Sequence, residues 1–158
     1  MYDTYMIHKN IDIYSNDCNF VLNNCVILRN VDNKDKKIVV KKKIINDVGE
    51  ILSQSNTNCK IYDIDETRAI FEKLGYVVLM SIEDKSKVYI NGEFKIVIQD
   101  VKDQATYIEI ETCINSILYD SIEKLKNTLI NLNLPVDTSN YYVKKAVIAL
   151  ENIKNIRC

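Results

Sequence analysis

Residues 85–101 read KSKVYINGEFKIVIQDV, and this stretch decides the fold class. Two alternating runs flank Asn91-Gly92, the residue pair that favours a tight type I′ hairpin because both central residues adopt positive φ. Residues 106–112, TYIEIET, alternate apolar and polar side chains with period two and predict a further strand. Strands joined by such short connections predict an antiparallel sheet.

The N-terminal part of the chain predicts more strands of the same kind. A cluster of turn-forming residues at 32–35 separates two apolar runs, and the polar residues 46–58 are expected to form a loop. The strands predicted here lie at residues 2–7, 25–31, 36–45 and 59–64.

Helices are predicted between and after the strands. Residues 65–74, DETRAIFEKL, follow the capping residues Asp63 and Asp65 and precede Gly75, and their apolar stripe would be Ile70, Phe71 and Leu74. Helical spacing returns at residues 119–132 and again after Pro135. The predicted fold class is therefore α+β, with an antiparallel barrel or an open barrel-like sheet flanked by helices.

The bulk properties narrow the function classes. The chain has 158 residues, which predicts a single domain over residues 1–158, and its net charge of -1 gives no steering toward nucleic acid or an anionic membrane. No apolar run has transmembrane length, and no signal peptide is visible. Five cysteines without a C-x-x-C pair argue against disulfides and zinc and favour the reducing cytoplasm. The single histidine excludes a multi-histidine metal site.

Several predicted strands carry charge on one face, since side chains two apart along a strand point the same way. The basic residues on such faces are Arg29, Lys41, Lys43, Lys85 and Lys87. One interpretation is a sheet with one solvated face, which needs no function. The other is a polar interior whose basic residues bind an anionic ligand.

Acidic residues could complete such an interior. Glu109 and Glu111 share a face about 7 Å apart, and carboxylate oxygens at that spacing suit magnesium or manganese. An ideal two-residue hairpin would add Asp100 to the lysine face, whereas a bulge would add Gln99 instead.

The order of these motifs resembles that of the CYTH family, the triphosphate tunnel metalloenzymes, over nearly the whole chain. The family includes class IV adenylate cyclases, thiamine triphosphatases and inorganic triphosphatases. The segments DTY (3–5), CVILR (25–29), LGY (74–76), KSKVY (85–89), IQDV (98–101) and YIEIE (107–111) resemble the family's D-T-Y-F, A-L-R-I-R, L-G-F, K-x-R-x-x-Y, L-D-E-V and F-V-E-I-E.

The resemblance implies a barrel that binds a triphosphate-containing small molecule or polyphosphate. It implies triphosphate-binding roles for Arg29, Lys41 or Lys43, Lys85 and Lys87. It also implies Mg²⁺ or Mn²⁺ held by Glu109 and Glu111, with Gln99 at the aligned acidic position and Asp100 as the alternative. A cyclase would use a ribose hydroxyl as nucleophile and a triphosphatase would use water.

The departures from the family keep a second function open. The family's opening E-x-E-x-K strand has no counterpart, and Ile27, Lys87 and Gln99 replace an arginine, an arginine and an aspartate. Lys87 keeps the charge but loses the bidentate fork of arginine. The alternative is therefore a degenerate, non-catalytic domain that binds a polyanion or a partner protein. An exposed edge strand could also pair with a second copy to give a homodimer.

Overall fold

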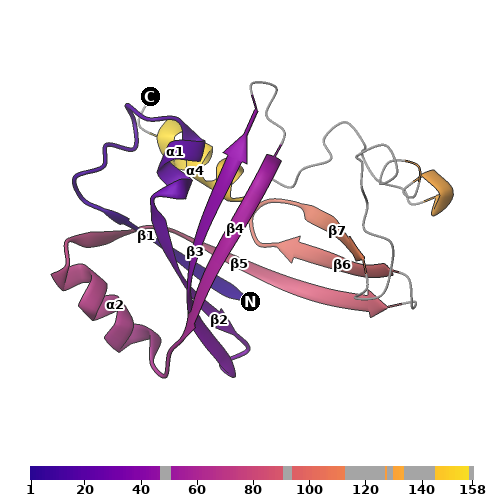
Figure 1. Ribbon diagram of the computed structural model, residues 1–158, viewed down its shortest axis with the longest axis horizontal. Helices are drawn as coiled ribbons and strands as arrows, with labels where there is room; N and C mark the ends of the chain where they lie inside the picture. The colour runs from indigo at the N-terminus through magenta and orange to yellow at the C-terminus, as the bar shows by residue number, and fades with distance from the viewer. Residues whose placement is uncertain (47–50, 91–93, 113–126, 128–129, 134–144, 157–158) are drawn as a thin grey trace. The chain divides into compact units, whose positions relative to one another are not determined.

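The computed structural model describes residues 1–46, 51–90, 94–112, 127, 130–133 and 145–156. The fold is α+β, with a seven-stranded antiparallel sheet in the order β4-β3-β2-β1-β5-β6-β7 (Figure 1). The predicted fold class is confirmed. The chain divides into two compact units: unit 1 is Met1–Lys85, Val101–Gln104 and Lys144–Cys158, and unit 2 is Ser86–Asp100 and Ala105–Val143.

Five strands contribute to unit 1, and β1 lies at its centre. β1 pairs antiparallel with β2 on one side and with β5 on the other, and β3 and β4 extend the sheet beyond β2. Their bounds are Tyr2–His8 for β1, Cys25–Val31 for β2, Asp35–Ile45 for β3, Ile51–Lys60 for β4 and Tyr76–Ile90 for β5. The turn between β2 and β3 uses Asp32 and Asn33 at φ 51° and 59°, the left-handed region that asparagine and aspartate tolerate best.

β4 corrects the prediction of a loop at residues 46–58. Most of that segment, from Ile51 onward, is a strand that pairs with β3. The pairing runs from Lys60, which lies opposite Lys37, to Ile51, which lies opposite Ile45. The short strand predicted at 59–64 is only the end of β4. Its side chains from Ser53 to Lys60 are exposed, so this edge strand is held mainly by backbone hydrogen bonds and shows no apolar alternation.

Three helices have both ends among the described residues, and they lie in unit 1: α1 (Cys18–Asn23), α2 (Ile64–Lys73) and α4 (Lys145–Asn155). α1 was not predicted; it begins where the Asp17 side chain accepts a hydrogen bond from the Phe20 amide. α1 and α4 pack side by side (Figure 1). The helix predicted at 119–132 lies mostly outside the described residues.

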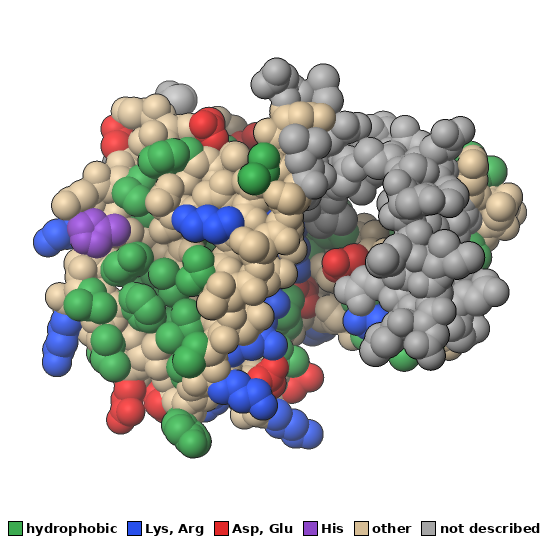
Figure 2. Space-filling model, in the orientation of Figure 1, with side chains coloured by type: hydrophobic (Ala, Val, Ile, Leu, Met, Phe, Trp, Pro, Cys, Tyr) green, Lys and Arg blue, Asp and Glu red, His purple; other side chains and the backbone are tan. Residues whose placement is uncertain are grey.

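α2 confirms the predicted helix but not its apolar stripe. Asp63 caps it through the Glu66 amide at 2.8 Å, and Gly75 follows at φ 88°. Ile70 and Leu74 are 59% and 61% exposed, and hydrophobic side chains gather on the surface where Figure 1 places α2 (Figure 2). The half-buried stripe is Ile64, Thr67, Arg68 and Phe71, so an arginine lies on the side of α2 that faces the sheet.

The core of unit 1 forms around β1, where five consecutive residues are buried on both faces of the strand. Met6, Leu28, Val21, Val39 and Leu150 are at most 1% exposed. Asp3, Thr4 and Asp84 are buried with them. Charge inside an otherwise apolar core requires partners, and these partners define the candidate site below.

Unit 2 contains the antiparallel pair β6 (Phe94–Val101) and β7 (Thr106–Thr112). The strand predicted at 106–112 is confirmed. β5 and β6 are neighbours in the sheet, as the predicted hairpin requires, while the Asn91-Gly92 turn itself lies outside the described residues. In the described part of the chain, no helix has the length and apolar character to cross a membrane.

Candidate anion-binding site

One face of the unit 1 sheet carries the charged residues, and strand register places them there. Asp3 lies opposite Arg29, and Arg29 lies opposite Lys37. Lys41 and Lys43 follow Lys37 at even spacing along β3, so they share this face. Lys37 pairs with Asp35 at 2.9 Å, so these two residues add no net charge. We call the other charged residues of this surface the charged face; it consists of Asp3, Arg29, Lys41, Lys43, Asp84 and Lys145.

Asp3 and Arg29 form a bidentate ion pair at its centre. Arg29 donates from Nε to Oδ1 at 2.8 Å and from Nη2 to Oδ2 at 2.6 Å. The Asp3 side chain is 2% exposed and that of Arg29 is 17% exposed. The hydrogen bonds that Arg29 donates to Asp3 raise the pKa of Arg29 above its ordinary value. This parallel arrangement fixes the guanidinium plane.

Asp84 is the second buried carboxylate, and α4 supplies its partner. Lys145 Nζ lies 3.0 Å from Asp84 Oδ2, and the N-terminal ammonium lies 3.9 Å from Oδ1 and donates to the Asp84 carbonyl at 2.6 Å. The Asp84 side chain is fully buried. The pair therefore ties the first turn of α4 to β5.

The Lys41 side chain differs from those of Arg29 and Lys145 because it has no hydrogen bond or ion pair with any described residue. Its pKa is lowered from 10.5 to about 8, mainly by burial and next by the nearby Arg29 charge, while Asp3 acts in the opposite direction. Lys43 and Lys145 also lower it. A partly desolvated ammonium among other cations gains from an added anion.

The charge balance of this face is positive. Arg29, Lys41, Lys43 and Lys145 supply four cations, while Asp3 and Asp84 supply two anions. Tyr5 lies two residues after Asp3 on β1. Burial is the main cause that raises the pKa of Tyr5, and the charge of Asp3 is the second cause. The Tyr5 hydroxyl therefore stays protonated and can donate a hydrogen bond. These residue types can bind the oxygens of a phosphate group.

The structure brings Arg29, Lys41 and Lys43 together but does not add Lys85. In β5, Met80, Ile82 and Asp84 are buried, while Ser81, Glu83 and Lys85 are exposed. Ile82 pairs with Asp3, so Lys85 points to the opposite face. Lys85 therefore does not share a face with Arg29, because β5 alternates without a bulge there, and its role in triphosphate binding stays a prediction. Lys87 is exposed and belongs to unit 2.

In unit 2, the register decides between Gln99 and Asp100. Gln99 pairs with Tyr107 and Val97 pairs with Glu109, and Gln99 Nε2 donates to Glu109 Oε2 at 2.7 Å. Asp100 pairs with Thr106, and both lie on the other face of the strand pair, which also carries Ile108 and Ile110. Asp100 therefore does not share a face with Glu109 in this strand pair, and whether Asp100 joins the lysine face of β5 stays a prediction.

The metal ligands predicted from the sequence, Glu109 and Glu111, both lie in β7, and their role as ligands stays a prediction. No group of three or more metal-ligating side chains exists among the residues that the structure describes. Asp3 and Asp84 are each held by a cation, so the charged face of unit 1 offers no unpaired carboxylate for a metal.

Three important residues were missed from the sequence. Asp3 was recognised only as part of a motif, although its strand position places it opposite Arg29. Asp84 continues the alternation of Met80 and Ile82, and that pattern predicts an inward carboxylate. Lys145 gave no signal, because its partner comes from a distant strand.

Comparison with known proteins shows likeness in fold alone. No protein-family model and no curated protein matches the chain. Two Pyrococcus horikoshii OT3 structures each have a TM-score of 0.63. The PH1012 protein is 12% identical, and the match covers 95% of this chain and 79% of PH1012. The PH1819 protein is 16% identical, and the match covers 96% of this chain and 83% of PH1819. A structure described as a "putative adenylate cyclase" from Vibrio parahaemolyticus has a TM-score of 0.58 and 14% identity, over 94% and 79%.

Proposed function

We propose that the charged face of unit 1 binds the phosphates of a triphosphate-containing small molecule or of inorganic polyphosphate. Lys41 carries this proposal, because its ammonium is partly removed from water, has a lowered pKa and has no hydrogen-bond partner among the described residues. A phosphate oxygen would supply both a hydrogen bond and the missing negative charge.

The resemblance to the CYTH family supports the choice of ligand class. Arg29 and either Lys41 or Lys43 match basic residues of the family, and all three residues share one face. Likeness in fold to the structure described as an adenylate cyclase agrees with this assignment. Because the three described cysteines, Cys18, Cys25 and Cys59, are free thiols, we place the protein in the cytoplasm.

The first experiment measures thermal stabilisation by tripolyphosphate, with and without Mg²⁺. A ligand present at 100 times its Kd stabilises the native state by about 2.7 kcal/mol. For a chain of this size that is a rise in Tm of roughly 5–10 °C. Lys41→Met should lose most of the rise. The matched control is Lys42→Met, because Lys42 is the next residue of β3 and points to the other face.

Two outcomes would contradict binding at this face. One is the absence of any rise with tripolyphosphate. The other is a rise of equal size in Lys41→Met and Lys42→Met, which would place the anion elsewhere.

Turnover of a triphosphate is the second candidate function, and the resemblance of residues 107–111 to the CYTH motif favours it. By that resemblance, Glu109 and Glu111 would hold Mg²⁺ or Mn²⁺. The paired state of Asp3 and Asp84 favours the alternative of a non-catalytic domain that binds a polyanion. The assay is phosphate or pyrophosphate release from ATP, thiamine triphosphate and tripolyphosphate. Rates above roughly 1 per second that vanish in Glu109→Gln would establish an enzyme.

A further inference from the structure

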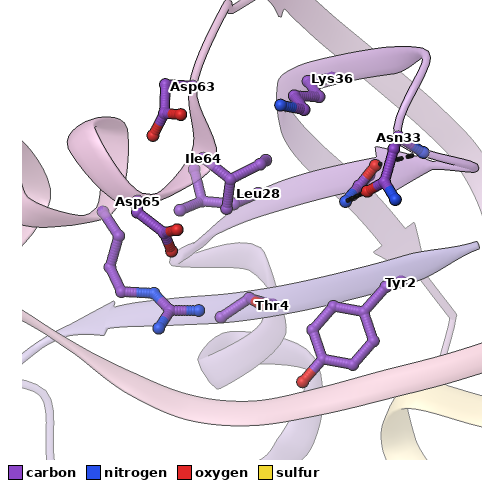
Figure 3. A pocket seen from close by; sticks show the side chains of 10 residues that line it. Tyr2, Thr4, Leu28, Asn33, Lys36, Asp63, Ile64 and Asp65 are labelled. Atoms are coloured by element: carbon purple, nitrogen blue, oxygen red, sulfur yellow. Dashed lines mark hydrogen bonds between the residues drawn. The ribbon is translucent and has the colours of Figure 1, made fainter.

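A cavity lies on the face of unit 1 opposite the charged face. Its volume is about 270 Å³, and Figure 3 shows Tyr2 and Thr4 of β1 along one side of it. Both alternate with Asp3 along β1 and therefore point away from the charged face. The remaining walls come from β2, the start of β3 and the start of α2. We call this cavity the α2 pocket.

Arg68 is the unusual residue of the α2 pocket. It lies on the half-buried stripe of α2 with Ile64 and Phe71, where an apolar side chain is expected. Its Nε atom is buried and has no hydrogen-bond partner, and it is the single buried side-chain polar atom in this state among the described residues. A buried donor without an acceptor is costly, so an acceptor oxygen brought by a ligand would be favoured.

An acidic residue lines the same pocket. Asp65 lies three residues before Arg68 on α2, at a spacing where opposite charges often pair. No ion pair joins them in the part of the chain that the structure describes. Figure 3 shows Asp63 and Asp65 beside the cavity, with Lys36 and Asn33 across from them. Asp63 is already engaged as the cap of α2.

We propose that the α2 pocket binds a small zwitterion, with its carboxylate on Arg68 and its ammonium on Asp65. The Nε and Nη donors of arginine match the two oxygens of a carboxylate. Two cations, Lys36 and Arg68, and two anions, Asp63 and Asp65, line the pocket. This balance disfavours a dianion such as phosphate. The volume suits a molecule the size of an α-amino acid.

The test follows the Arg68 Nε–H resonance by ¹⁵N NMR during titration with L-alanine and L-lysine. Both should shift this resonance saturably. Calorimetry, which does not depend on the Arg68 resonance, should show at least tenfold weaker binding in Arg68→Lys, because lysine keeps the charge but lacks the paired donors of the guanidinium. Asp65→Asn should weaken amino-acid binding and leave weak acetate binding unchanged. Lys73→Met, an exposed change in the last turn of α2, is the matched control and should bind as the wild type does. Circular dichroism of each variant checks that α2 still folds.

Three results would overturn the proposal. The first is no saturable shift with either amino acid in the wild-type protein. The second is acetate or inorganic phosphate binding as tightly as L-alanine. The third is undiminished amino-acid binding in folded Arg68→Lys. Since Lys41→Met leaves the α2 pocket intact, failure here is separate from failure of polyphosphate binding at the charged face.

Discussion

Replacing Asp3 with asparagine tests whether the charged face is built around one buried ion pair. Asp3→Asn keeps the size of the side chain but removes the charge that offsets Arg29. Breaking one partner of a buried pair costs about 3–5 kcal/mol. The Arg29 side chain is 17% exposed, and its partial contact with water should place the loss near the lower end. A loss of about 3 kcal/mol corresponds to a fall in Tm of roughly 6–12 °C for a chain of this length.

The assay is urea unfolding followed by circular dichroism, with Asp35→Asn as the matched control. Asp35 pairs with Lys37 at 2.9 Å, but the two side chains are 43% and 26% exposed, so its loss should be under about 1 kcal/mol. A double-mutant cycle with Arg29→Met should show coupling. Equal losses in Asp3→Asn and Asp35→Asn, or no coupling to Arg29, would refute the reasoning.

Asp3→Asn should also change ligand binding in the opposite direction to stability. With one of two carboxylates removed, the net positive charge of the charged face increases. Tripolyphosphate should therefore bind Asp3→Asn more tightly than wild type at equal salt, as measured by calorimetry on protein held well below its lowered Tm. Weaker binding would mean that Asp3 contributes to the ligand site rather than opposing it.

Three further predictions concern Lys41, Leu150 and Lys85. The pKa of Lys41 falls from 10.5 to about 8 on folding, so above that pH the unfolded chain binds more protons than the folded protein does. Urea unfolding should therefore show the free energy of unfolding rising from about pH 8 to pH 9. Lys41→Met should reduce the rise, and an unchanged rise would mean that another group titrates. Leu150 is fully buried, so Leu150→Ala should lower the free energy of unfolding by about 2–5 kcal/mol. The control Ile156→Ala, at an 82% exposed site of the same C-terminal segment, should lower it by under about 0.5 kcal/mol. Similar losses of stability in the two variants would contradict the packing of α4. Lys85→Ala should leave the stabilisation by tripolyphosphate unchanged, since Lys85 points away from Arg29, and loss of the stabilisation would show that β5 presents Lys85 to the ligand.

The sequence predicted the strands whose side chains alternate. β7 matches its predicted bounds because its polar and apolar residues alternate, and β2 matches because its apolar run ends at the turn-forming residues 32–35. β4 was missed because its side chains are exposed and polar, and its pairing with β3 depends on the backbone. α1 was missed because one cap, Asp17, precedes only six helical residues.

The candidate site was predictable where one strand carries several charges. Lys41 and Lys43 share a face by spacing alone, and hairpin pairing adds Arg29. The sequence could not show that Asp84 pairs with Lys145, because 61 positions separate them. The sequence also favoured a ligand-binding role for Lys85 through a motif. In the structure, Met80, Ile82 and Asp84 are the buried alternate positions of β5, so Lys85 points to the other face.

The most direct test of the account is the pKa of Lys41 itself, measured by NMR of its side-chain Nζ with and without tripolyphosphate. The account predicts a pKa of about 8 in the free protein, raised when phosphate oxygens neutralise the cations around it. The Lys42 resonance serves as the internal reference and should not move. A free pKa near 10.5, or a lowered pKa that stays unchanged at saturating tripolyphosphate, would contradict the claim that the charged face binds phosphate.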